Sequence, residues 1–198
     1  MTIKLALFSV YDKTGITDFS RKLTSLGIQI VATSGTLAFL NTNGVNFVKH
    51  VSEITQFPEI LNGRVKTEHP KLMGGILAVR NNKSHMHDLK RLGIKRIDMV
   101  VCNLSPIDKT INGDHDLQIF LQHIDIGGPN IIKAAIKNFE NVVLIVNPKR
   151  YNSIYQELET KGDICMKTRV KLVLEALKET KRYDDLIYAS LKQKLIGI

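Results

Sequence analysis

The residues best suited to chemistry lie in two short segments that are far apart in the sequence. The first, residues 63–70, carries Arg64, Lys66 and Thr67 after a glycine and before a histidine that precedes proline. Arg can hold a phosphate through two hydrogen bonds, and Lys adds a mobile positive charge. His69 is either a proton carrier or a structural residue held extended by the following proline. An exposed basic loop is the alternative, but the long preceding stretch favours a phosphate-binding segment.

The second segment starts at Asp125, which stands just before Gly127, Gly128 and a predicted helix. Lys133 and Lys137 are four residues apart on that helix and therefore share one of its faces. A carboxylate near a lysine in a closed cleft can form a proton-transfer pair. The alternative is a carboxylate that only stabilises the positive N-terminal end of the helix.

Two polar turns follow the first two apolar runs of the chain. The first turn joins Ser9 to a predicted helix through Asp12, Lys13 and Thr14. A helix N-terminus at the carboxyl end of a strand presents free N–H groups that suit a phosphate. A simple cap made by Asp12 or Thr14 is the alternative, and the residues alone do not separate the two.

The second turn contains Thr33, Ser34, Gly35 and Thr36, which supply the hydroxyls and the glycine that a backbone anion site needs. An ordinary capped turn is more common in isolation. The preceding strand is expected to lie beside the first strand, which favours anion binding. The turn is not a Walker motif, because no Gly-Lys-Ser/Thr ending follows.

Apolar runs that alternate with helical patterns must position these turns. The expected strands are residues 5–10, 28–32, 45–48, 98–104 and 141–146. Helical spacing covers residues 14–26, 37–43, 84–92, 117–123, 129–137 and most of the chain from 151 onward. Residues 51–71 form a long polar stretch, typical of a functional or disordered loop. Short turns between the strands and helices predict an α/β fold with a parallel sheet covered on both faces.

Composition is that of a soluble globular protein and narrows the expected partners. The chain has 198 residues, a net charge of +9, and no apolar run near the ~20 residues that cross a bilayer. Basic residues are spread along the chain without interleaved aromatics, so we expect no nucleic-acid binding. Cys102 and Cys165 are expected as free thiols in a reducing cytoplasm. The histidines show no metal-ligand spacing, so neither a metal nor a cofactor is expected.

Taken in order, the motifs resemble one known family. They are Ser-Val-x-Asp-Lys-Thr-Gly from residue 9, Thr-Ser-Gly-Thr from 33, Gly-Arg-Val-Lys-Thr-x-His-Pro from 63, Cys-Asn-Leu-x-Pro from 102, Asp-Ile-Gly-Gly from 125 and Ala-Ala-x-Lys-Asn from 134. Together they are similar to the IMP cyclohydrolase domain of the bifunctional purine-biosynthesis enzyme, over nearly the whole chain. The resemblance implies a single domain, 1–198, with a methylglyoxal synthase-like α/β/α sandwich, a mainly parallel sheet, and helices from about residue 148 packed on it.

The resemblance also implies an activity. It is the ring closure of 5-formamidoimidazole-4-carboxamide ribotide to IMP with loss of water, by a stand-alone domain without a transformylase domain. Two protein partners stay open, a second copy of the chain and a separate transformylase. The alternative from another class is a non-catalytic purine-nucleotide-binding or regulatory module of the same fold.

The resemblance assigns roles to individual residues. Lys66 would stabilise the developing oxyanion, and Asp125 and Lys137 would share the proton transfers. The residues implied in binding the 5′-phosphate and the rest of the ribotide are Ser9, Lys13, Thr14, Thr33, Ser34, Gly35, Thr36, Arg64, Thr67, Asn103, Ser105, Gly127 and Gly128.

The sequence departs from the family pattern at a few positions. Ser105 stands where the family has a catalytic tyrosine, and Tyr11 stands where it has a serine. We hypothesise that Tyr11 is catalytic and delivers its hydroxyl into the space of the missing tyrosine, which requires the two strand ends to face one cleft. Ser34 replaces a family glycine, Lys133 an arginine and Phe139 a histidine.

Overall fold

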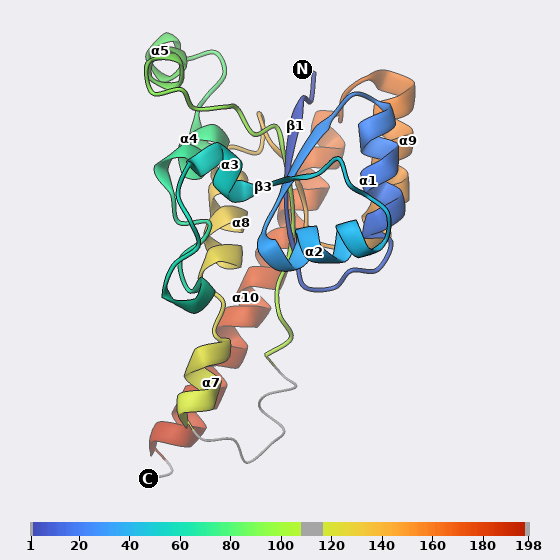
Figure 1. Cartoon of the computed structure of the whole chain (residues 1–198). Coiled ribbons are helices and arrows are strands. Elements are labelled where there is room, and N and C mark those ends of the chain that lie inside the picture. The colour runs from blue at the N-terminus through green and yellow to red at the C-terminus, as the bar shows by residue number, and fades with distance from the viewer. Residues whose placement is uncertain (1, 108–116, 197–198) are drawn as a thin grey trace.

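A computed structural model describes residues 2–107 and 117–196. Within these residues, five strands form a fully parallel sheet in the order β3-β2-β1-β4-β5 (Figure 1). The strands are β1 Leu5–Val10, β2 Gln29–Ala32, β3 Lys49–His50, β4 Met99–Asn103 and β5 Val143–Ile145. The predicted α/β class with a parallel sheet is confirmed.

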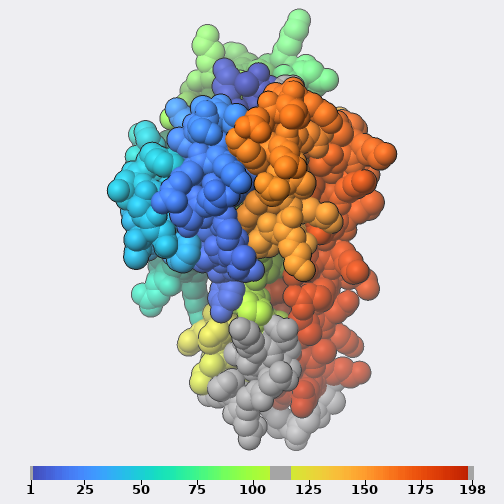
Figure 2. All heavy atoms as spheres, turned by 90° about the vertical axis from the view of Figure 1, so that its right-hand side faces the viewer, coloured from blue at the N-terminus to red at the C-terminus, as the bar shows by residue number. Residues whose placement is uncertain are grey.

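Helices cover both faces of the sheet. One face packs against α1 (Ile16–Ser25), α2 (Ser34–Thr42) and α9 (Tyr151–Lys161), and Figure 2 shows α9 lying between α1 and α10. The other face packs against α3 (Val51–Thr55), α4 (Pro70–Leu77), α8 (Gly127–Lys137) and most of α10 (Met166–Ile196). The remaining helical elements are η1 (Leu61–Gly63), α5 (Lys83–Arg91), α7 (Leu117–His123) and η2 (Pro148–Arg150). None of the helices in the described ranges is long and apolar enough to cross a membrane.

The side chains of β1 explain why its sequence is apolar at every position except Ser9. Ala6, Phe8 and Val10 enter the core under α1 and α9, whereas Leu5 and Leu7 enter the core under α4 and α8. Successive side chains of a strand point to opposite faces, so a strand with both faces covered needs apolar residues wherever a side chain enters a core. Ser9, near the carboxyl end of the strand, lines the cavity described below.

Two predictions between residues 45 and 71 were wrong. Residues 45–48 were expected as a strand, but β3 begins only at Lys49, because the Val45 N–H bonds Leu40 O at 2.9 Å at the end of α2. Gly44, at φ +72°, makes the left-handed turn that this helix ending requires. The expected loop over residues 51–71 contains α3, η1 and the start of α4.

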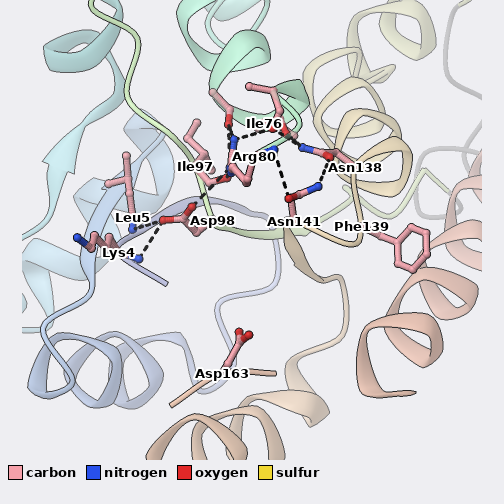
Figure 3. A network of polar contacts seen from close by, with 12 residues as sticks. Lys4, Leu5, Ile76, Arg80, Ile97, Asp98, Asn138, Phe139, Asn141 and Asp163 are labelled. Atoms are coloured by element: carbon pink, nitrogen blue, oxygen red, sulfur yellow. Dashed lines mark hydrogen bonds and ion pairs between the residues drawn. The ribbon is translucent and has the colours of Figure 1, made fainter. Parts of the chain in front are cut away.

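The amino ends of β1 and β4 meet a buried polar network (Figure 3). Arg80 donates hydrogen bonds to Gly75 O, Ala78 O and Ile97 O, and its guanidinium lies 3.5 Å from Asp98 Oδ1. Asp98 Oδ2 accepts from the N–H groups of Lys4 and Leu5. These contacts fix the end of α4 against the amino edge of the sheet.

Asn138 extends this network from the end of α8. Its side-chain Nδ2 donates to Ile76 O at 2.6 Å and to Ala78 O at 3.0 Å. A buried amide that satisfies two carbonyls removes the cost of leaving them unpaired. The sequence pattern gave no sign of either Arg80 or Asn138 in this role.

Candidate functional site

A cavity of about 630 Å³ opens at the carboxyl ends of β1, β2 and β4. Its volume lies in the range of pockets that bind small molecules. The strand order reverses direction between β1 and β4, and ligands of open parallel sheets bind at such a reversal. Fourteen of the predicted site residues line it, namely Ser9, Tyr11, Lys13, Thr33, Gly35, Thr36, Arg64, Lys66, Thr67, Asn103, Ser105, Asp125, Gly127 and Gly128.

Three hydroxyls meet where β1 and β2 end. Thr36 is buried, and its Oγ1 accepts from Val10 N at 3.1 Å and donates to Val10 O at 3.3 Å. Thr33 Oγ1 lies 3.4 Å from Ser9 Oγ and 3.5 Å from Thr36 Oγ1. The cluster offers a ligand polar groups whose positions the backbone fixes.

Asn103 holds the turn that follows β1. Its Oδ1 accepts from the N–H groups of Tyr11 and Asp12 at 2.7 and 2.8 Å, and its Nδ2 donates to Asp12 O at 3.1 Å. Lys13 folds back so that its ammonium donates to Val10 O and Tyr11 O. Partial burial lowers the pKa of Lys13, and the charge of Asp12 opposes that shift. The turn therefore presents a cation at the cavity, held by the main chain.

The two segments singled out in the sequence meet directly at the start of α8. A Cβ atom on Gly127 would lie 2.5 Å from Thr67 Oγ1 and 2.8 Å from Glu68 Oε1. A Cβ on Gly128 would lie 2.5 Å from Asp125 Oδ2. Neighbouring side chains thus occupy the space of a Cβ at both glycines, so a larger residue at either position would force one of them to move.

Asp125 is held from two sides. Its Oδ1 accepts from Gly128 N at 3.1 Å, and its own N–H donates to the hydroxyl of the buried Tyr183 at 2.7 Å. Asp125 also lines the cavity. Burial and the Asp125 charge raise the pKa of the neighbouring Cys102 thiol. The carboxylate makes the helix-terminus contact and still faces the cavity, so the two roles considered for it are compatible.

The donors of the basic segment already have an acceptor. Glu68 Oε2 accepts from Lys66 N at 2.9 Å and from Thr67 N at 3.0 Å. The side chains of Arg64 and Lys66, which also line the cavity, supply its positive charge on this side.

Three predicted site residues do not line the cavity. Lys137 is exposed at the last residue of α8, ~15 Å along the helix axis from Gly127. Thr14 is exposed, and its N–H bonds Asp12 Oδ1 at 2.9 Å, outside α1, which begins at Ile16. Ser34 turns its hydroxyl to His50 and Glu59. These three residues therefore lie outside the cavity, and their roles in the site stay predictions.

The hypothesis about Tyr11 and Ser105 keeps its structural requirement. β1 pairs with β4, Val10 lies opposite Asn103, and both Tyr11 and Ser105 line the cavity. The Tyr11 side chain is 55% exposed. It can therefore swing without repacking the core, and its catalytic role stays a prediction.

Several lining residues were missed in the sequence, namely Asn62, Glu68, Leu121, Gln122, His123, Ile124 and Ile126. Most belong to α7 or to the link from α7 to α8, where only Ile126 falls within a motif noted in the sequence. Glu68 stood inside the basic segment as its one acidic residue, which was a usable signal. His69 does not line the cavity, and its Nδ1 accepts from Lys71 N at 3.1 Å and caps α4, which favours the structural role.

The cysteines were assigned correctly. Cys102 is buried and Cys165 is exposed, and both are free thiols.

Comparison with known proteins places the chain among families of matching fold. Residues 15–130 match the MGS-like domain family, and residues 135–196 match the AICARFT/IMPCHase bienzyme family. The crystal structure of ForH superposes with a TM-score of 0.83 and 31% identity, covering 96% of this chain and 100% of that one.

Longer proteins have a segment similar in sequence to this chain. The bifunctional purine biosynthesis protein PurH of Acetivibrio thermocellus is 46% identical over 194 residues, which are 98% of this chain and 38% of that protein. PurH of Persephonella marina is 47% identical over 96% of this chain and 36% of its own length. PurH of Bacillus subtilis is 42% identical over 94% and 36%. The chain thus spans little more than a third of these relatives.

Proposed function

Because the chain belongs to the MGS-like domain family and continues into a segment of the AICARFT/IMPCHase bienzyme family, we propose that it is an IMP cyclohydrolase. It would close 5-formamidoimidazole-4-carboxamide ribotide to IMP in purine biosynthesis. The observation that carries this proposal is the convergence, in one cavity, of hydroxyls and cations at the strand ends with Lys66 and Asp125.

The polar rim at the ends of β1 and β2 suits the 5′-phosphate. Lys13 and Arg64 supply the positive charge, and the Ser9, Thr33 and Thr36 hydroxyls supply hydrogen bonds. Arg and Lys recognise phosphate by charge-assisted hydrogen bonds, with the Arg contact more directional. Phosphate binding at this rim would leave the base near Lys66 and Asp125.

The ring closure needs a donor and a proton acceptor. The carboxamide nitrogen attacks the formyl carbon, a C–N bond forms, and the formyl oxygen becomes an oxyanion and then a hydroxyl. Lys66 would stabilise that oxygen, and Asp125 would take the proton that the attacking nitrogen loses. Loss of the hydroxyl as water, with one further proton from the formamide nitrogen, gives the aromatic ring. The reaction is intramolecular, so holding the reacting groups in contact lowers much of the barrier.

Lys137 has no part in this version of the mechanism, because it lies at the far end of α8. We assign the proton transfers to Asp125 and Lys66, with Tyr11 as a further hydroxyl from β1. The matched variants Lys66→Ala and Lys137→Ala test this assignment.

A non-catalytic purine-nucleotide-binding module is the second candidate. The observation that favours it is Ser105, which stands where the resembled family has a catalytic tyrosine. A module would bind IMP without forming it from the formylated ribotide.

The deciding experiment measures the rate of IMP formation by absorbance and the affinity for IMP by calorimetry. We expect turnover by the wild type, loss of about 10²–10³ in kcat for Lys66→Ala and about 10²–10⁴ for Asp125→Asn. IMP binding should persist in both variants. Lys137→Ala, the exposed control, should keep wild-type turnover.

Two results would overturn the proposal. IMP binding by the wild type without any turnover would assign the module instead. Loss of turnover in Lys137→Ala, with Lys66→Ala unaffected, would reject the proton-transfer assignment made above.

A further inference from the structure

A cluster of three side chains lies beside the cavity and joins three separate elements. Ser34 opens α2, His50 ends β3, and Glu59 belongs to the segment between α3 and η1. Ser34 Oγ donates to Glu59 Oε1 and lies 2.9 Å from His50 Nε2. His50 Nε2 also lies 3.5 Å from Glu59 Oε1, and the Ser34 N–H points to the same oxygen at 3.4 Å.

The hydrogen bonds of His50 exclude a nucleophilic serine. Ser52 N donates to His50 Nδ1 at 3.2 Å, and Ser52 Oγ lies 2.6 Å from the same nitrogen. A backbone N–H can only donate, so Nδ1 acts as an acceptor and the ring proton of the neutral imidazole is on Nε2. That Nε2–H faces Ser34 and Glu59. A general base for Ser34 would need a free lone pair on Nε2, so His50 acts here as a donor that holds Glu59.

Glu59 sits at the base of the loop that carries the cavity cations. Ile60 and Val65 form an antiparallel bridge, with Ile60 N to Val65 O at 3.1 Å and Val65 N to Ile60 O at 3.4 Å. Arg64 and Lys66, which line the cavity, stand within and just after this bridge.

The tip of the loop is conformationally strained. Leu61 and Asn62 have φ of +53° and +56°, and Gly63 follows at +83°. A leucine in the left-handed region is uncommon and persists only where the surroundings fix it. The Ile60–Val65 bridge holds the loop only to itself. The contacts of Glu59 with Ser34 and His50 tie the base of the loop to α2 and β3.

The charges around Glu59 agree with an anchoring role. Burial opposes its ionisation, but hydrogen bonds from Ser34 and the nearby charge of Lys66 bring its pKa below the ordinary value. A Cβ on Gly63 would lie 4.0 Å from both Glu59 Oε2 and Lys66 Nζ, so both side chains reach the space beside Gly63.

We propose that Glu59 is a positioning residue, which Ser34 and His50 hold at the start of α2 so that the residue 60–66 loop presents Arg64 and Lys66 to the cavity. Its effect on turnover rests on the proposed cyclohydrolase function, whereas its effect on the loop does not. The Ser34 hydroxyl, at a position where the resembled family has glycine, adds one of the contacts.

Hydrogen exchange of the full chain without ligand tests the loop directly. In Glu59→Ala, amides of residues 60–66 should exchange at least tenfold faster, while those of β1 and β4 stay unchanged. Glu59→Gln keeps an oxygen acceptor and should retain most of the protection. Glu140→Ala, an exposed carboxylate elsewhere, is the matched control and should behave as the wild type.

Kinetics on the same variants separates positioning from a general loss of stability. Glu59→Ala should weaken IMP binding about tenfold and lower kcat through Lys66, Glu59→Gln should recover most of both, and Ser34→Gly should lose only a few-fold. Unchanged exchange in Glu59→Ala would overturn the proposal even if the wild type forms IMP. Faster exchange in Glu59→Ala, together with a wild type that forms no IMP, would support the positioning role of Glu59 and reject only the proposed cyclohydrolase function.

Discussion

The two edges of the sheet carry the same kinds of charged group in opposite settings. At the amino edge, the Arg80 and Asp98 side chains are 9% and 4% exposed and contact each other and the backbone. At the carboxyl edge, Arg64 is exposed, and Lys66 and Asp125 are half-buried around an open cavity. Charges whose partners are all within the protein hold the fold, whereas charges that converge on a cavity are available to a ligand.

The difference also shows in what each group bonds. Asp98 accepts from two backbone N–H groups and pairs with Arg80, so its desolvation is compensated internally. Arg64 and Lys66 depend for their placement on a strained loop and on Glu59. Removing a group from the amino edge should therefore cost stability, and removing one from the carboxyl edge should cost binding or turnover.

The largest expected effect is on Asp98. Asp98→Ala leaves Arg80 buried without its carboxylate and should lower the free energy of unfolding by about 3–5 kcal/mol, measured by urea denaturation. Asp88→Ala, which breaks an exposed ion pair with Arg91, should cost less than about 1 kcal/mol. If the folded fraction of Asp98→Ala also loses turnover, the two edges are coupled and the comparison fails.

The next effect concerns the turn between α9 and α10. Glu157 accepts hydrogen bonds from Cys165 N and Thr168 Oγ1, which, with Lys161, outweigh burial and lower its pKa from 4.5 to about 2. A carboxyl with a lowered folded pKa stabilises the fold above its unfolded pKa and loses that contribution as pH falls through the folded value.

Between pH 4.5 and 2, the free energy of unfolding of the wild type should therefore fall by up to about 3 kcal/mol more than that of Glu157→Gln. Denaturant titrations at a series of pH values measure this difference. The affinity for IMP at neutral pH should be the same in both proteins. Parallel pH profiles for the two proteins would contradict the role given to Glu157.

The smallest effect is at the contact between the two cavity segments. Gly127→Ala places a Cβ against Thr67 and Glu68, so one of these side chains must move. We expect IMP binding to weaken about tenfold, equivalent to about 1.4 kcal/mol, with less than that lost in stability. Calorimetry measures the binding free energy and urea denaturation the free energy of unfolding. A larger loss in unfolding free energy than in binding free energy would show that Gly127 stabilises the fold, like the residues of the amino edge.

Much of the site was predictable because parallel strands end at one edge. Once residues 5–10 and 28–32 were identified as neighbouring strands, the turns after them had to lie together, and Lys13, Thr33 and Thr36 do line one cavity. Lys137, to which the resemblance gave a share of the proton transfers, does not line this cavity. Spacing of four residues correctly put it on one face with Lys133, but that face is exposed and Lys133 contacts Asp184 there.

The parallel α/β fold and the family follow from the sequence, because apolar periodicity and the ordered motifs are local properties of the chain. Which polar groups face the cavity, and which stabilise the protein, depends on how distant segments pack. Thr67 meets Gly127 across sixty residues, Asp125 is held by Tyr183, and Ser34 turns from the cavity to Glu59. Hydrogen bonds and close approaches depend on distances of a few ångströms between such segments, and the local pattern does not encode those distances.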